Sequence, residues 1–235
     1  MERLANKVTL LDCLAGCWLT DNDKQVIFVA LDLLYLRSLF FLKDLRKRAN
    51  LEEEEYGDMI FLPVVDSNET DSDNFKHSSS HTLEHLDFNN LLLVNDETYV
   101  FFENVIAHLN LHESSNLWWS DFNSISGSQY QSISVPPLII PKNLAMILSR
   151  DLVKYVAHNA NYLRSFSSLL TSLGIWFSSL DKKLVNDHQW SKKLPNNPKD
   201  FRVDESALAF QGVSPKAMRQ IWKQNLPQAM TNSNS

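Results

Sequence analysis

Three histidines at four-residue intervals are the first side chains in the sequence whose spacing could support chemistry. On a helix, positions i, i+4 and i+8 lie roughly on one face, and imidazoles accompanied by carboxylates are common zinc ligands. The residues are His77, His81 and His85. Three consecutive serines between the first two histidines disfavour both a helix and the rigid shell that a metal site needs. We therefore expect a solvated loop, with no bound metal and no cofactor.

A second set of metal-binding residue types combines two cysteines with two histidines. Cys13 and Cys17 have helical spacing, and so do His108 and His112. The four could form a tetrahedral zinc site if two helices met. Nothing in the sequence brings the two pairs together, and a free cysteine is often a small buried side chain. We interpret the cysteines as core residues.

The sequence contains no signature of an enzyme. Its five glycines are scattered, whereas Rossmann and P-loop nucleotide sites need several glycines close together after a strand. Neither the Gly-x-Ser-x-Gly motif of serine hydrolases nor the His-Glu-x-x-His motif of zinc hydrolases occurs. We predict that the protein is not an enzyme and has no catalytic residues.

The charges of the chain are segregated along the sequence. Residues 49–140 include sixteen acidic residues and one basic residue, whereas residues 141–235 include thirteen basic and six acidic residues. Basic residues near tryptophans could bind nucleic acid by neutralising phosphates and stacking on bases. The sequence pI of 5.6 argues against a dedicated nucleic-acid-binding protein. The candidate contacts in this alternative are Lys43, Arg46, Lys47, Arg48, Lys192 and Lys193.

Large apolar side chains near loops and near the C-terminus favour protein contacts. Residues 200–226 resemble an amphipathic helix that docks in a partner's groove, although docking on the chain's own core is an equal alternative. Tryptophan is enriched in the binding hot spots of interfaces. The candidate partner-binding residues are Met218, Ile221, Trp222, Leu226, Trp118 and Trp119.

The elements that must position these residues are predicted to be mainly helices. Apolar residues recur at steps of three and four from Leu163 to Leu184, a coiled-coil-like seam of three heptads. Leu169 and Trp176 widen this stripe, which favours a bundle helix over a free coiled coil. Residues 26–42 form an apolar run that contains two charged residues, so we predict a buried core helix and no membrane span.

The predicted fold is an irregular, mainly α helical bundle with a minor hairpin formed by residues 91–94 and 98–102. The alternative is an α/β or α+β fold in which residues 26–30, 60–65 and 91–94 are strands. We expect a helical domain over residues 1–190, interrupted by polar loops at about 66–83 and 113–135. Residues 191–235 are predicted to form a basic arm with a short C-terminal helix that begins at Ser214-Pro215.

The function predicted from these patterns is that of a non-catalytic adaptor or scaffold subunit of an intracellular multiprotein complex. Hydrophobic residues make up 44% of the chain, more than a lone helical bundle requires, so one or more protein partners are expected. The low cysteine count and the lack of a secretory signal favour the nucleus or cytoplasm. The alternatives are a nucleic-acid-associated subunit that binds through the basic C-terminal third, and a metal-supported domain or hydrolase that uses the histidine clusters.

Overall fold

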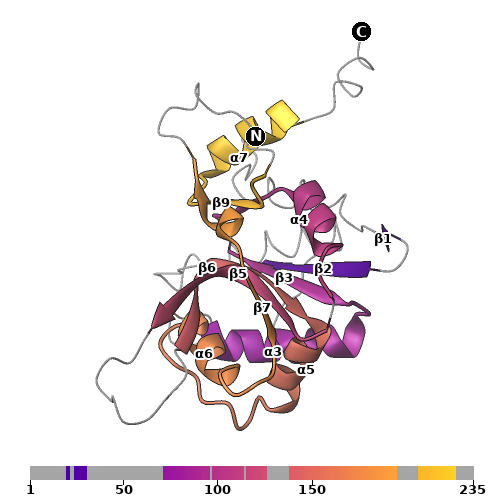
Figure 1. The fold of residues 1–235 in the computed structure, drawn as a ribbon, viewed down its shortest axis with the longest axis vertical. Helices are drawn as coiled ribbons and strands as arrows, with labels where there is room; N and C mark the ends of the chain where they lie inside the picture. The colour runs from indigo at the N-terminus through magenta and orange to yellow at the C-terminus, as the bar shows by residue number, and fades with distance from the viewer. Residues whose placement is uncertain are drawn as a thin grey trace, which may run out of the picture.

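The computed structural model describes residues 20–21, 24–30, 71–95, 97–113, 115–125, 138–194 and 206–225. This part of the chain contains two β-sheets and five α-helices (Figure 1). The larger sheet has the strand order β1-β2-β3-β6-β5-β7 and the smaller one β4-β9-β8.

The strands of the larger sheet are β1 (Thr20–Asp21), β2 (Lys24–Ala30), β3 (Asn90–Val94), β6 (Leu138–Ser149), β5 (Leu117–Ile125) and β7 (Lys183–Asn186). The strands of the smaller sheet are β4 (Tyr99–Val100), β9 (Ala209–Gln211) and β8 (Lys192–Lys193). The helices are α3 (Asp71–His85), α4 (Phe102–Leu109), α5 (Arg150–His158), α6 (Leu169–Trp176), α7 (Pro215–Asn225) and the 3-10 helix η1 (His188–Ser191).

Four strands of the larger sheet run in the same direction. β2 is parallel to β3 and β5 is parallel to β7, while β6 is antiparallel to both β3 and β5. The carboxyl ends of β2, β3, β5 and β7 therefore lie along one edge of the sheet, beside the amino end of β6. We call this the carboxyl-end edge. In open α/β sheets, ligands bind outside the carboxyl ends of the strands.

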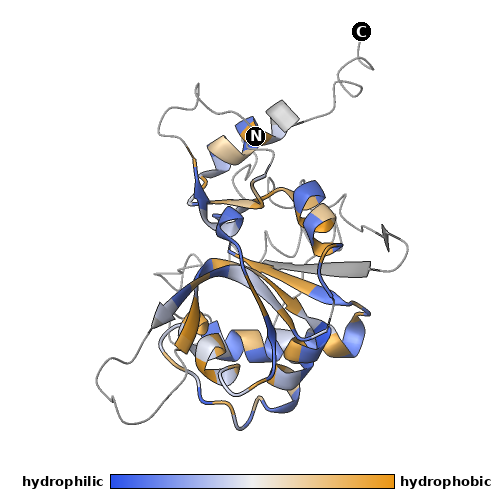
Figure 2. Ribbon diagram, in the orientation of Figure 1, coloured by the Kyte–Doolittle hydropathy of each residue, from blue (hydrophilic) through white to orange (hydrophobic). Residues whose placement is uncertain are grey.

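The central strand β3 is buried on both faces of the larger sheet. Because successive side chains of a strand point to opposite faces, Leu91 and Leu93 enter one hydrophobic cluster and Leu92 and Val94 enter another. A strand that is covered on both sides has a continuous apolar sequence instead of an alternating one. This explains the run of three leucines and a valine in β3, and the central strands are largely orange in Figure 2.

Helices and short strands cover the two faces of the larger sheet as separate layers (Figure 1). On one face, α3, α5 and α6 contribute side chains such as Phe75, Val153 and Leu173 to the first cluster. On the other face, α4, η1 and β9 close the second cluster. A third cluster lies between the smaller sheet and α7, which contributes Met218 and Ile221. The larger sheet is thus the middle layer of the molecule.

The prediction of a mainly α helical bundle is wrong, because the chain forms a mixture of helices and strands in two mixed sheets. The predicted alternative with strands is correct for residues 26–30 and 91–94, which lie in β2 and β3. Residues 60–65 lie outside the described residues. Residues 98–102 do not form a hairpin with β3, since β4 pairs with β9 in the other sheet.

Helix α3 occupies most of the segment that was expected to be a polar loop at about 66–83. Its apolar side chains are limited to Phe75 and Leu83, and the buried polar side chains of its inner face hydrogen-bond instead of packing as hydrocarbon. The Ser72 hydroxyl lies 2.7 Å from that of Ser172 in α6, and the Lys76 ammonium donates to Ser165 at 2.8 Å. A helix held by polar contacts lacks the apolar periodicity by which helices are predicted.

The predicted coiled-coil-like seam is also wrong, because its residues are spread over connecting segments, a short helix and a strand. Leu163 lies in the connection after α5, α6 contains only eight residues, and Leu184 lies in strand β7. Gly174 fixes the position of α6: a Cβ atom there would lie 2.7 Å from the carbonyl oxygen of Ile139 in β6. The helix therefore packs closely against the backbone of the sheet at this position. The second predicted polar loop, at about 113–135, is also wrong in part, because residues 117–125 form strand β5.

Candidate functional site

A polar cluster lies at the carboxyl-end edge because of the register of the sheet. Leu93, Met146, Ser120 and Asn186 are neighbours in one row across β3, β6, β5 and β7. Asp121 is the next residue of β5 toward the carboxyl-end edge, so it lies beside Asp187, the residue that follows β7. The turn that follows β3 lies at the same edge.

An irregularity in the pairing of β5 with β6 brings a lysine to Asp121. Ser120 pairs with Met146 and Phe122 pairs with Pro141, so residues 142–145 of β6 stand opposite a single residue of β5. Bulges of this kind redirect side chains and are common next to active sites. Here the bulge places Lys142 with its Nζ atom 2.8 Å from Oδ1 of Asp121.

Asp121 is a buried carboxylate with three partners, which come from two elements. Its side chain is only 2% exposed, and it accepts hydrogen bonds from Lys142 of β6 and from His188 and Ser191 of η1. Burial alone would raise the pKa of Asp121, but these three hydrogen bonds outweigh burial and hold the pKa below its ordinary value of 3.8. Asp121 is therefore an anion at neutral pH.

His188 projects from the first position of η1 into solvent while remaining bound to Asp121. Its side chain is 73% exposed, and its Nδ1 atom lies 2.7 Å from Oδ1 of Asp121. The preceding residue, Asp187, caps η1 by accepting the backbone N–H of Gln189 at 2.9 Å, and its other oxygen accepts the indole N–H of Trp119 at 3.3 Å. These contacts fix the start of η1 and with it the position of the imidazole.

The turn after β3 is joined to the same helix by a second polar cluster. The Thr98 hydroxyl lies within hydrogen-bonding distance of the side-chain oxygens of Asn95 and Gln211. Gln211, in β9, donates its amide to the carbonyl oxygen of Trp190 in η1 at 3.1 Å. The turn residue Glu97 accepts the backbone N–H of Val213 at 2.8 Å. The carboxyl ends of β3 and β7 and the smaller sheet thus share one hydrogen-bonded network.

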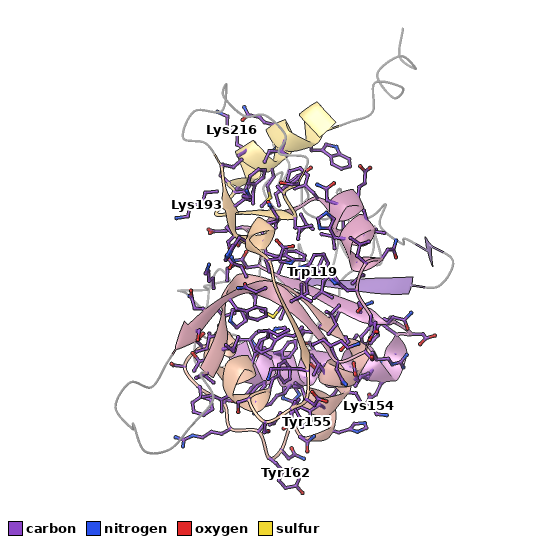
Figure 3. All side chains as sticks on the ribbon, viewed as in Figure 1. Trp119, Lys154, Tyr155, Tyr162, Lys193 and Lys216 are labelled. Atoms are coloured by element: carbon purple, nitrogen blue, oxygen red, sulfur yellow. The ribbon has the colours of Figure 1, made fainter. Side chains whose placement is uncertain are left out.

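Trp119 of β5 packs against η1. Its ring meets Trp190 edge to face at 5.2 Å between centroids. His108 of α4 and His112, which follows that helix, pack against it at 6.3 and 5.1 Å. Figure 3 shows Trp119 between the larger sheet and the layer that contains α4 and β9. His108 and His112 are thus ring contacts of a core tryptophan; Cys13 and Cys17 lie outside the described residues.

The three histidines considered as metal ligands lie on helix α3, far along the chain from the polar cluster. His81 and His85 stack with ring centroids 4.1 Å apart, and His77 is exposed one turn earlier. No group of three or more histidine, cysteine, aspartate or glutamate side chains is placed to hold a metal ion within the described part of the chain. The expectation that these three histidines hold no metal stays a prediction.

The candidate partner-binding residues differ in exposure. Trp118 and Trp119 are 0% exposed, so the chain itself covers both side chains. Met218 and Ile221 are buried under α7, whereas Trp222 of the same helix is 39% exposed. Leu226 lies outside the described residues. A role of the remaining surface of α7 in binding a partner stays a prediction.

The candidate nucleic-acid contacts are described only in part. Lys192 and Lys193 form β8, at the side of the molecule where Figure 3 also shows Lys216 of α7. Lys43, Arg46, Lys47 and Arg48 lie outside the described residues.

The sequence interpretation missed Asp121, Lys142, His188 and Ser191. One signal was present: Asp121 interrupts an aromatic segment between Trp119 and Phe122. An acidic residue within such a strand is expected to be buried, and a buried carboxylate must be paired.

Comparison with known proteins identifies relatives that are named as sugar transferases. No protein-family model matches the chain. It is 26% identical over 187 residues to human UDP-GalNAc:β-1,3-N-acetylgalactosaminyltransferase 2, which covers 74% of this chain and 36% of the human protein. The Xenopus tropicalis protein of the same name is 24% identical over 224 residues, 89% of this chain and 44% of that protein. Mouse β-1,3-galactosyltransferase 6 is 25% identical over 160 residues, 60% of this chain and 47% of that protein. The chain spans less than half the length of these relatives.

These similarities overturn the predicted function. The proteins that the chain resembles are named as transferases, so the interpretation as a non-enzymatic adaptor or scaffold is wrong, as are its nucleic-acid-binding and hydrolase alternatives. The predicted nuclear or cytoplasmic location is contradicted by the same relatives, and a low cysteine count does not determine a compartment by itself. None of the described helices is long and apolar enough to cross a lipid bilayer.

Proposed function

We propose that the chain is a glycosyltransferase domain that takes galactose or N-acetylgalactosamine from its UDP derivative and joins it to an acceptor sugar in a β-1,3 linkage. The observation that carries this proposal is the similarity to transferases of two sugar specificities that share the β-1,3 linkage in their names. The names of these relatives agree on the β-1,3 linkage and differ in the transferred sugar. The transfer assay below therefore compares both donor sugars.

The geometry of the larger sheet supports a binding site at the carboxyl-end edge. Four strands end there, and open sheets of this kind bind ligands outside the carboxyl ends of their strands. Two clusters of polar side chains lie at this edge, with Asp121, Lys142 and His188 in one cluster and Thr98 and Gln211 in the other.

The reaction makes a specific demand on such a site. The oxygen of an acceptor hydroxyl forms a bond to the anomeric carbon of the donor sugar, and the bond from that carbon to the phosphate oxygen breaks. UDP leaves with the electron pair, and the hydroxyl proton must pass to a base. A positioned base contributes about 10²–10⁴-fold to reactions of this kind, so a transferase site should contain one next to the acceptor hydroxyl.

A transfer assay with defined acceptors tests the proposal. We expect the purified chain to convert UDP-GalNAc or UDP-galactose, together with aryl glycoside acceptors, into disaccharides with a β-1,3 linkage, as read by mass spectrometry and NMR. The matched 3-deoxy acceptors should give no product, because they lack the attacking hydroxyl, and GDP-mannose should not replace the donor. Failure of the chain both to bind UDP and to consume either donor would contradict the proposal.

A further inference from the structure

We propose that His188 takes the proton from the attacking acceptor hydroxyl and that Asp121 is the positioning residue that orients its imidazole. This inference rests on the proposed transferase function and assigns the base that the function requires. It depends on one arrangement, an exposed imidazole bound to a buried carboxylate at the carboxyl-end edge.

The hydrogen bond between the two side chains determines which nitrogen of His188 can act as a base. An ionised carboxylate can only accept hydrogen bonds, so the 2.7 Å contact from Nδ1 to Oδ1 of Asp121 requires the hydrogen to be on Nδ1. In the neutral imidazole, Nε2 then carries the free lone pair. Because the side chain is 73% exposed while that of Asp121 is 2% exposed, Nε2 is open to a ligand and the orienting group is shielded from water.

The Asp121 carboxylate has a second charged partner besides His188. The Lys142 ammonium lies 2.8 Å from the same carboxylate oxygen and neutralises Asp121, so the carboxylate does not depend on a protonated histidine for its counter-ion. The other nearby carboxylate, Asp187, has its two oxygens occupied by the backbone N–H of Gln189 and the indole of Trp119. Both nearby carboxylates thus have hydrogen-bond partners other than His188.

The position of η1 places His188 where a substrate would arrive. The helix follows directly after the carboxyl end of β7 and contacts β5, β6 and β9. Asp187 caps its start, and Ser191 at its end accepts the Asn143 amide at 2.7 Å. Hydrogen bonds thus hold both ends of η1, and this fixes the position of the His188 imidazole. In the transfer step, the hydroxyl hydrogen moves to Nε2 as the oxygen bonds to the anomeric carbon, and His188 returns the proton to water after the product leaves.

Substitutions at His188 test this assignment within the full chain. We expect His188→Ala and His188→Gln to lower sugar transfer by about 10²–10⁴-fold while the rise in melting temperature on adding UDP is unchanged. Added imidazole should restore part of the activity of His188→Ala, which a purely structural role would not allow. Asp121→Asn should also lower the turnover number more than it changes the Michaelis constant. His158→Ala, at an exposed histidine of α5 on the opposite layer, is the matched control and should transfer sugar like the wild type.

The possible results separate this inference from the proposed function. Wild-type transfer that both His188 variants retain would overturn the role of His188 and leave the transferase function standing. A loss of transfer that imidazole does not restore, together with a weakened response to UDP, would also overturn it, because His188 would then support donor binding. A wild-type chain that neither binds UDP nor transfers sugar would overturn the proposed function and this inference with it.

Discussion

Replacing Trp118 by alanine is expected to lower the free energy of unfolding by about 3–5 kcal/mol, the range found for buried aromatic side chains. Trp118 is 0% exposed and lies in the layer between the larger sheet and helices α3, α5 and α6. Its ring meets Phe122 edge to face at 4.9 Å and Phe177 at 5.0 Å between centroids. Alanine would leave a cavity at a point where two strands and a helix end meet.

Urea denaturation of the purified chain measures this loss, and Tyr162→Ala is the control. Tyr162 is 88% exposed and projects from the lower end of the molecule in Figure 3. Its replacement should change the free energy of unfolding by less than about 0.5 kcal/mol. Equal stability of Trp118→Ala and the wild type would contradict the burial of Trp118. That result would favour the prediction that Trp118 contacts a protein partner.

Replacing Asp121 by asparagine is expected to lower the free energy of unfolding at pH 7 by about 1–3 kcal/mol, the cost of leaving buried polar groups without their partners. Asparagine has nearly the same shape, but its amide group would place a donor among the donors of Lys142, His188 and Ser191. The lower part of the range is the better expectation, because Lys142 is 35% exposed and can regain water.

The pH dependence of this difference gives a more specific test. The pKa of Asp121 lies below its ordinary value of 3.8 because of its three hydrogen bonds, so the folded state binds the Asp121 proton less readily than the unfolded state. The stability due to the carboxylate is therefore fully present above pH 4 and is lost as the pH falls through the folded-state pKa. We expect the stability gap between wild type and Asp121→Asn to narrow below pH 4. A gap that keeps its full size well below pH 4 would contradict a stabilising role of the Asp121 carboxylate.

The parts of the fold that were predictable from sequence are those with a local signal. Residues 91–94 were recognised as a strand candidate because a strand buried on both faces is a short, continuous apolar run. Helix α7 begins at Pro215 directly after Ser214, the residue types that favour the first position and the cap of a helix. The remaining elements lack such signals. The polar interior of α3 resembles the composition of a loop, and the steps of three and four from Leu163 to Leu184 arise by coincidence across a loop, a short helix and a strand.

The candidate site was not predictable because its partners are distant in sequence. Asp121 and His188 are 67 positions apart, and only the register of β5 with β7 makes them neighbours. The bulge that delivers Lys142 depends on the pairing of β5 with β6 and has no sequence motif. Large apolar residues such as Trp118 suggest a protein partner in the sequence. In the structure they fill the two layers on either side of the larger sheet. A sheet that is covered on both faces buries more apolar surface than the expected bundle would.

Hydrogen exchange of the chain with and without UDP tests most directly whether a sugar nucleotide binds at the carboxyl-end edge. We predict slower amide exchange on adding UDP at residues 97–100, which comprise part of the turn that follows β3 and strand β4, and around η1, at residues 186–193. Exchange in α5, on the opposite layer, should be unchanged. Protection confined to other elements, or identical exchange in both conditions at saturating UDP, would contradict the account.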